Sequence, residues 1–341
     1  MNKRVQFLDI AKGLGILLVI YGHVYTPLKD YIYSFHMPLF VFISGIFFKE
    51  GVDAKKFFVS KVNRILVPYF FFSLVTWCIF TAVSYKQEDA TAFHKQITNV
   101  AKIFIGSGTN GNVALWFLGT LFVVTTIYYF ITLLVSNTIG RSIIVLLMSV
   151  AGYIFFKRNM ALPNIADSTC SLILFFHIGY LGRKFILEYN NKLAAILATV
   201  VCFLGMVVLT PLNISLTGIK FVDTANNMLG NYFIFYTGAL MGTMLIVCVS
   251  WLINRNNFLV FLGTNSLIIM GVQLPIIALV DYFLMTNNIS RNTTLTGIGE
   301  FVLVTVLSLG LVKLFNTYLP KLVGTEALIE YPKTKGTVVT G

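Results

Sequence analysis

The chain has 341 residues, of which 57% are hydrophobic and 11% are charged, and its formal net charge is +12. Soluble domains have about 25% charged residues, so this composition and a mean hydropathy of +0.83 exclude a water-soluble globular protein and indicate one embedded in a lipid bilayer. The positive charge is spread over the connections between apolar stretches. It forms no basic face on a soluble domain, which excludes nucleic acid as a partner.

The apolar stretches are long enough to cross a bilayer, since a membrane helix needs about 20 mostly apolar residues. We expect ten of them, at residues 7–26, 32–48, 65–84, 113–135, 141–156, 169–187, 193–212, 230–253, 258–285 and 299–319. The predicted fold is therefore an all-α integral membrane protein, a bundle of about ten transmembrane helices. A single transmembrane domain covers residues 1–320, and a polar cytoplasmic tail follows at 321–341.

The basic residues predict the orientation of this bundle. With the N-terminus in the cytoplasm, roughly two thirds of the 25 Lys and Arg residues fall on the cytoplasmic side. This bias agrees with the positive-inside rule. We therefore expect a multi-pass protein of the plasma or inner membrane, with both termini in the cytoplasm.

The first span carries three ionisable residues, Asp9, Lys12 and His23, and such residues are costly within a bilayer. Lys12 and His23 are eleven positions apart, so they lie on nearly the same helix face, about 16 Å apart along its axis. Asp9 precedes Lys12 by three residues and is its expected ion-pair partner. Lys12 alone could extend to the cytoplasmic interface. His23 is too short to do so, and we expect it to be functional.

The second span contains the segment FHMPLFVFISG, residues 35–45, and a short outer turn at 26–31 joins it to the first. His23 and His36 therefore reach similar depth on antiparallel neighbours. They could hydrogen-bond, share a proton or bind a metal, or form a purely structural pair. No third ligand is evident, and zinc normally takes at least three, so we expect no metal. A base with an orienting partner fits better, whereas His177 alone in its span should be a packed, hydrogen-bonded histidine.

These segments, together with KVNRILVPY at 61–69, resemble the acyltransferase-3 family of integral membrane acyltransferases, and most closely its branch of sugar O-acetylases. Two later segments, LWFLGTLF at 115–122 and FLGTNSLIIMGVQLP at 261–275, are similar to further family segments. The resemblance runs along most of the chain and agrees with the expected ten helices. Its first two helices carry the most specific motifs.

The chain departs from the family pattern at three places. The family usually has arginine where this chain has Lys12, and lysine keeps the charge but loses the bidentate fork of a guanidinium. The late helix often has histidine where this chain has Gln273, which removes a titratable group. In the basic inner segment Arg64 matches the family well and Lys61 less closely.

The resemblance implies a membrane-bound O-acyltransferase. It would move an acetyl group from cytoplasmic acetyl-CoA to a hydroxyl of a cell-surface or exported carbohydrate, such as a capsule, an exopolysaccharide or a lipid-linked glycan. His23 would be the general base and His36 its partner or a second acid/base, by direct transfer or through an acyl-histidine. Lys12, Lys61 and Arg64 would bind the donor phosphates, whereas the positive-inside bias better explains Arg183 and Lys184. Ser44, Asn265 and Ser266 are possible donors to the oxyanion, and residues 85–112 could meet the acceptor.

Membrane lipid and glycan-assembly proteins are the other expected partners. A secondary transporter or flippase for a glycan or glycolipid is the alternative function. Ten spans and internal histidines would serve it, but we see no internal repeat, and the ionisable residues are concentrated in the first two spans. A purely structural membrane subunit would leave His23 and His36 without a role.

Overall fold

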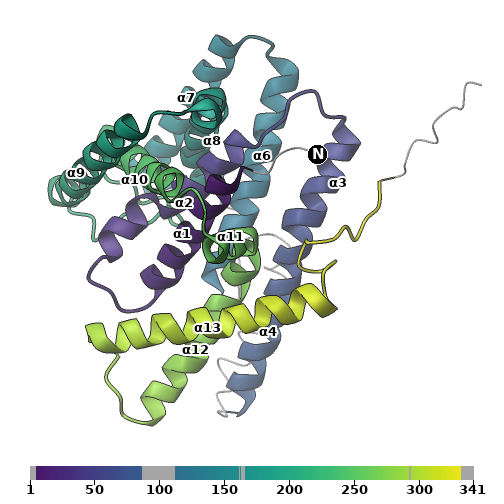
Figure 1. Cartoon of the computed structure of the whole chain (residues 1–341), viewed down its shortest axis with the longest axis vertical. Coiled ribbons are helices and arrows are strands. Elements are labelled where there is room, and N and C mark those ends of the chain that lie inside the picture. The colour runs from purple at the N-terminus through teal and green to yellow at the C-terminus, as the bar shows by residue number, and fades with distance from the viewer. Residues whose placement is uncertain (1–4, 87–111, 161, 163–165, 292, 332–341) are drawn as a thin grey trace, which may run out of the picture.

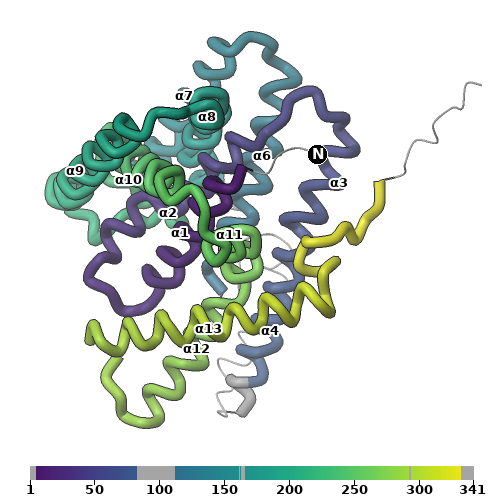
Figure 2. Tube along the Cα trace, in the orientation of Figure 1, coloured from purple at the N-terminus to yellow at the C-terminus, as the bar shows by residue number. Residues whose placement is uncertain are grey.

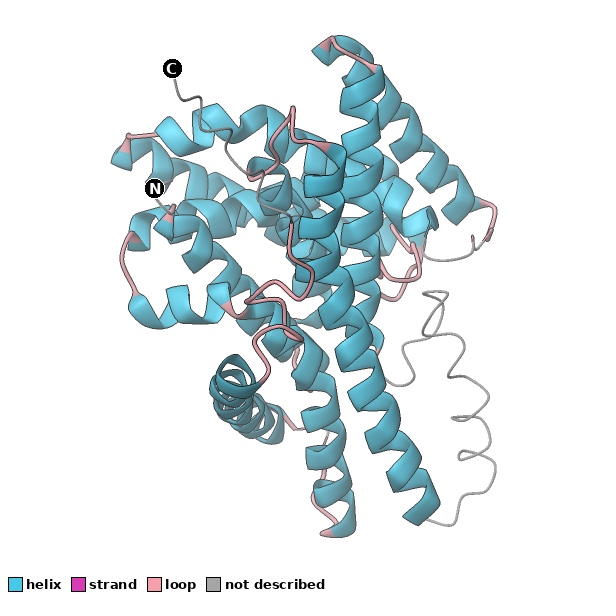
Figure 3. Ribbon diagram, turned by 90° about the vertical axis from the view of Figure 1, so that its right-hand side faces the viewer, coloured by secondary structure: helices cyan, strands magenta, loops and turns pink. Residues whose placement is uncertain are grey.

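The computed structural model describes residues 5–86, 112–160, 162, 166–291 and 293–331. Every regular element in these ranges is helical, and Figure 3 shows no strand there. The predicted all-α fold is confirmed.

Most of the chain forms long helices that coincide with the expected spans. They are α1 (Gln6–His23), α2 (Lys29–Ile46), α4 (Val67–Lys86), α6 (Trp116–Leu134), α7 (Thr138–Lys157), α8 (Ala166–Glu188), α9 (Lys192–Thr217), α10 (Tyr232–Ile253), α12 (Ser266–Thr286) and α13 (Thr294–Tyr318). Shorter elements are α3 (Ala54–Lys61), the π-helix η1 (Val62–Leu66), the 3₁₀-helix η2 (Val113–Leu115) and α11 (Asn257–Thr264). The ninth expected span is divided at Asn265 into α11 and α12.

Eight helical segments among the described residues are long and apolar enough to cross a membrane. Neither α1 nor α2 is among these eight. Both carry ionisable or polar side chains that lower their hydropathy, and both lie in the middle of the molecule, where other helices rather than lipid surround them (Figure 1). The functional histidines predicted from the sequence are therefore on the two helices that protein covers best.

The helices differ in how much of their surface the protein covers. Over their apolar windows α9 and α7 are only 17% and 22% buried, whereas α12 is 56% buried. The largest fully buried side chains come from the central helices and include Phe42, Phe72, Tyr128, Phe175 and Phe176. The core is thus aromatic and central, and α7 and α9 present apolar side chains at the periphery.

We name the two ends of the bundle after the predicted orientation. The inner end carries the connection 47–53 and α3, and the outer end carries the turn 24–28 and the connection 218–231. In Figure 1 α4 and α12 both finish at the lower, outer end.

α1 packs directly against α11, and Figure 2 shows the two tubes side by side. A Cβ atom on Gly13 would overlap the carbonyl oxygen of Leu259, and one on Gly263 would overlap that of Asp9. The two backbones are therefore in contact, as small residues allow at helix crossings in membranes. Because Gly13 faces α11, the neighbouring Lys12 points about 100° away around the helix, into the cavity described below.

Candidate active site

The outer halves of α1 and α2 bring His23 and His36 against one tyrosine. The ring centroid of Tyr33 lies 6.0 Å from that of His23 and 5.0 Å from that of His36. His36 is buried and His23 is half-buried. The two imidazoles thus reach the same ring at similar depth, as their spacing predicts, and Tyr33 rather than a direct hydrogen bond connects them among the described residues.

Each imidazole is held by its own helix. His23 Nδ1 donates to the Val19 carbonyl at 2.7 Å, and His36 Nδ1 donates to the Ile32 carbonyl at 2.8 Å. A carbonyl oxygen only accepts, so in both neutral rings the proton is on Nδ1 and Nε2 is the acceptor. No other described side chain or backbone group hydrogen-bonds to either Nε2. Each ring is therefore held so that its Nε2, the nitrogen with which a general base takes up a proton, is left without a partner among the described residues.

The outer approach to the histidines combines aromatic rings with two opposite charges. Phe221 packs edge-on against Tyr33 at 5.4 Å, and Lys29 Nζ lies 5.1 Å from the ring centroid of Tyr33 and 5.0 Å from that of Phe221. The Asp223 carboxylate acts electrostatically on both His23 and Tyr33. All five side chains are half-buried, so the protein covers none of them completely.

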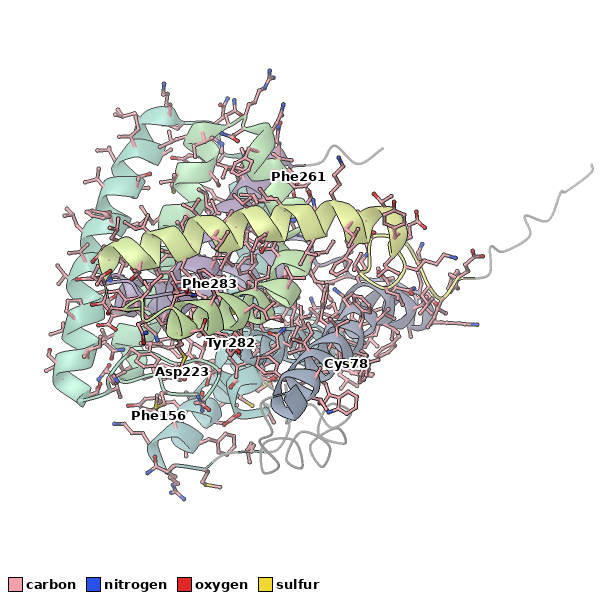
Figure 4. The ribbon with its side chains drawn as sticks, turned by 90° about the horizontal axis from the view of Figure 1, so that it is seen from below. Cys78, Phe156, Asp223, Phe261, Tyr282 and Phe283 are labelled. Atoms are coloured by element: carbon pink, nitrogen blue, oxygen red, sulfur yellow. The ribbon has the colours of Figure 1, made fainter. Side chains whose placement is uncertain are left out.

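Two buried asparagines hold the outer connection that supplies Phe221 and Asp223. Asn213 Nδ2 donates to the Leu229 carbonyl at 2.8 Å, and Asn227 Nδ2 donates to the Gly152 carbonyl at 2.8 Å. Figure 4 views the molecule from this end and labels Asp223. Residues 85–112, which were expected to meet the acceptor, lie outside the described residues from 87 to 111. No role was predicted for this second outer connection.

A cavity of about 510 Å³ opens at the inner end. Five basic residues and no acidic one are among its lining residues, namely Lys12, Lys49, Lys56, Lys61 and Arg64. The three residues predicted to bind the donor are therefore brought together in one place. Lys49 and Lys56 were not singled out, because basic residues in an inner loop are already expected from the positive-inside bias.

Lys12 lines this cavity while it remains paired with Asp9. Its Nζ lies 2.8 Å from Asp9 Oδ1 and 5.9 Å from the ring centroid of Phe47. The predicted ion pair is confirmed. The Lys12 side chain keeps a quarter of its surface exposed, whereas Asp9 is buried.

Lys61 and Arg64 come from a single continuous helical segment, in which α3 passes through η1 into α4. Lys61 is the last residue of α3, with its Nζ 5.6 Å from the Phe57 ring centroid, and Arg64 lies within η1. Short π-helical turns inside α-helices are frequent at functional sites. The turn here directs two cations toward the same cavity.

The inner cavity and the histidine pair are stacked along the bundle axis. Phe40 lines the cavity and packs against Phe117 at 6.0 Å. His36 precedes Phe40 by one helical turn, or about 6 Å, and neither histidine is among the residues that line the cavity. The Phe40–Phe117 contact thus lies between the basic residues and the imidazoles.

The candidate oxyanion donors differ in position. Ser44 and Ser266 line the cavity, and Ser44 Oγ donates to the Phe40 carbonyl at 2.8 Å. Asn265 does not line it, because Asn265 Nδ2 donates to its own helix and its Oδ1 accepts from Asn316 at 2.7 Å. The structure therefore uses Asn265 for packing at the break between α11 and α12.

Gln273 is fully buried, and neither atom of its side-chain amide has a partner among the described residues. It follows the cavity-lining Met270 by three residues on α12, so the two side chains share a helix face. Gln273 lies farther from the inner end than Met270, just as His36 lies farther from it than Phe40. A buried amide without a partner costs about 1–3 kcal/mol, and such groups call for an explanation in function or bound water.

His177 behaves as a packed histidine, as expected. The Tyr128 hydroxyl lies 2.8 Å from its Nδ1, and Ser142 Oγ lies 2.9 Å from its Nε2. Both ring nitrogens are thus occupied and the residue is buried.

Arg183 has a structural contact at the inner connection. Its Nη1 donates to the Phe48 carbonyl at 3.1 Å, and its guanidinium lies 4.5 Å from the Tyr180 ring centroid. Arg141 pairs with Glu50 at 2.6 Å in the same connection. These contacts hold the chain segment that supplies Phe48 and Lys49 to the cavity wall.

A family model described as an acyltransferase domain, acyltransferase 3, matches residues 5–316. The chain belongs to the acyltransferase 3 family. It is accordingly a membrane-embedded acyltransferase, which confirms the resemblance seen in the sequence and disfavours the transporter or flippase alternative. As an acyltransferase 3 protein it uses an acyl donor and an acceptor.

The chain is also similar to the nodulation protein NolL of Mesorhizobium japonicum. The two are 33% identical over 107 residues, which cover 26% of this chain and 28% of that protein. The chain thus spans little more than a quarter of the curated relative's length. No solved structure matches it.

Proposed function

We propose that this acyltransferase transfers an acetyl group from cytoplasmic acetyl-CoA to a hydroxyl of a cell-surface or exported carbohydrate. One observation carries the proposal: a cavity lined by five cations reaches Phe40, one helical turn from His36, and the Nε2 atoms of His36 and His23 have no hydrogen-bond partner among the described residues. The cations would bind a polyanionic donor, and the imidazoles would accept the proton that the acceptor hydroxyl loses.

The inner cavity suits the nucleotide part of CoA. Charge-assisted hydrogen bonds from its lysines and Arg64 would hold the phosphates. Ser266 and Leu267, in the first turn of α12, also line the cavity, so the positive end of that helix borders it. The pantetheine arm would then extend past Phe40 and Phe117 toward the histidines.

His23 would act where the acyl carbon meets the acceptor. As the hydroxyl oxygen attacks the thioester carbonyl, its proton passes to His23 Nε2, the C–S bond breaks, and the proton returns to the departing CoA sulfur. Base assistance of this kind typically gives about 10²–10⁴-fold in rate. His36, held in the same tautomer and also against Tyr33, would be the second acid/base or the partner of His23.

Gln273 is our candidate for the donor that stabilises the developing oxyanion. Its amide is buried, unpartnered and one turn deeper than the cavity wall. A hydrogen bond formed only in the transition state lowers the barrier without tightening substrate binding.

The acceptor would approach from the outer end. Sugars present C–H faces that stack on aromatic rings and hydroxyls that donate to carboxylates, and Tyr33, Phe221 and Asp223 supply both beside His23. This topology requires the orientation predicted from the basic residues, with both termini in the cytoplasm of a plasma or inner membrane and glycan-assembly proteins on the other side.

The direct test compares envelope glycans. Membranes containing the wild-type chain are incubated with acetyl-labelled acetyl-CoA and glycan purified from a strain that lacks the gene. We expect base-labile O-acetyl groups on the glycan and stoichiometric release of CoA thiol. Loss of the gene with no change in O-acetylation of any envelope glycan would refute the carbohydrate acceptor.

A further inference from the structure

We infer that the segment after α13, residues 319–331, is part of the donor site. We call it the C-terminal strap. Through Asn63 it fixes the π-helix η1 and thereby the direction of Arg64 and Lys61. The inference rests on the proposed function, because it takes CoA to be the donor. From the sequence alone, residues 321–341 are expected to form a polar cytoplasmic tail.

The first observation is a set of three hydrogen bonds made by one side chain. Asn63 Nδ2 donates to the Ile329 carbonyl at 2.9 Å, and Asn63 Oδ1 accepts from the backbone N–H groups of Leu328 and Ile329, each at 2.9 Å. Asn63 is buried. Its amide therefore pairs with the strap backbone through both its donor and its acceptor, which no other side chain of this size does in the same geometry.

Two further contacts hold the strap at other points. Gly324 adopts a φ of +76°, and a Cβ atom there would lie 2.9 Å from Pro68 Cγ and 3.0 Å from the Asn63 carbonyl oxygen. The Tyr331 hydroxyl donates to Asp53 Oδ1 at 3.4 Å, and Asp53 is the N-cap of α3. The strap thus follows the segment from the start of α4 back to the start of α3, as the yellow chain in Figures 1 and 2 shows.

The form of η1 explains why it needs an external partner. A π-helical turn holds one residue more than an α-helical turn and is rare. If η1 relaxed to an α-helix, residues before it would rotate by about 100° relative to α4. Lys61 would then turn away from the cavity, and Arg64 would change direction. The strap bonds to Asn63, inside η1 and next to Arg64, oppose this change.

Asn63 is therefore a positioning residue, which acts through Arg64 and Lys61. Asn63 itself does not line the cavity, whereas Arg64 and Lys61 do. A purely structural role would lower thermal stability and leave the affinity for CoA unchanged in the folded fraction. A positioning role raises the Kd for CoA while the folded protein remains intact.

The experiment measures CoA binding by calorimetry with the full chain in detergent. The variants are Asn63→Ala, which removes all three bonds, Asn63→Asp, which keeps the acceptor and loses the donor, and a deletion of residues 328–341. Asn287→Ala is the matched control, because Asn287 is an exposed asparagine at the outer end that bonds only within its own helix region. Size exclusion confirms folding of each variant.

We expect Asn63→Ala and the deletion to raise the Kd for CoA about tenfold, equivalent to about 1.4 kcal/mol. Asn63→Asp, which sets a buried carboxylate oxygen against the Ile329 carbonyl, should have at least as large an effect, and Asn287→Ala none. In an Arg64→Ala background the Asn63→Ala effect should shrink, because residues that act through one another are not additive. CoA affinity unchanged in folded Asn63→Ala, Asn63→Asp and the deletion overturns the inference. If the wild-type chain does not bind CoA, the proposed donor itself fails, and the inference with it.

Discussion

His36 and Phe40 lie one turn apart on α2, yet they contact different parts of the molecule. His36 contacts Tyr33 at the outer end, whereas Phe40 lines the basic inner cavity and contacts Phe117. One helical turn therefore separates the proposed donor cavity from the proposed base. The acyl group must therefore cross that turn to reach the base.

A larger side chain at Phe40 should obstruct the passage of the acyl arm. We expect Phe40→Trp to lower acetyl transfer at least tenfold while the Kd for CoA stays within about twofold, because the phosphates bind below the obstruction. Phe40→Leu, which is smaller, is the control and should retain transfer. CoA calorimetry and transfer kinetics on the same preparations check this; equal rates for the Trp and wild-type proteins would place the route elsewhere.

Removal of the Lys12 charge should weaken donor binding. A hydrogen bond to a charged group contributes about 1.5–3 kcal/mol, so Lys12→Ala should raise the Kd for CoA tenfold or more, and the effect should shrink in high salt. Lys12→Arg keeps the charge and should bind CoA well. Lys184→Ala removes an exposed lysine that does not line the cavity and serves as the control. If Lys12→Ala and Lys184→Ala bind CoA equally, Lys12 has no part in donor binding.

Gln273 should show opposite effects on stability and activity. Gln273→Met removes an unpartnered buried amide, so the melting temperature should stay level or rise, since an unsatisfied group costs about 1–3 kcal/mol. Acetyl transfer should nevertheless fall about 10²-fold, because the oxyanion loses a donor. Thermal unfolding and kcat are measured together. A stable variant with wild-type kcat would show that the amide has no catalytic role.

The Asp223 carboxylate should affect the KM for the acceptor and have no effect on the Kd for the donor. We expect Asp223→Asn to raise the KM for the purified glycan several-fold with an unchanged Kd for CoA, because Asp223 is in the outer connection that also supplies Phe221, at the opposite end of the molecule from the basic cavity. Asp30→Asn, at the same end of the molecule, is the matched control. Identical glycan KM values for Asp223→Asn and the wild type would remove the carboxylate from the acceptor site.

Local patterns were enough to predict much of this molecule. The apolar periodicity predicted the long helices, the three-residue spacing predicted the Lys12–Asp9 ion pair, and the short turn after α1 predicted neighbouring histidines. Each of these depends on residues close together in the chain.

Features that depend on distant residues were missed. Asn63 and Ile329 are 266 positions apart, and no periodicity in either segment indicates their pairing. The break at Asn265 lies between two apolar segments, α11 and α12, so hydropathy alone predicts one continuous span there. Lys49 and Lys56 reach the cavity because long-range contacts, such as that of Arg183 with the Phe48 carbonyl, fold the inner connection over it.

The most direct test of the account is single-turnover acetyl transfer by His23→Ala, measured beside its CoA affinity. His177→Gln, which alters a histidine used only for packing, is the control. We predict that His23→Ala binds CoA as the wild type does and transfers acetyl about 10²–10⁴-fold more slowly, because the Nε2 acceptor is gone. Transfer by His23→Ala at the wild-type rate would contradict the assignment of this imidazole as the base.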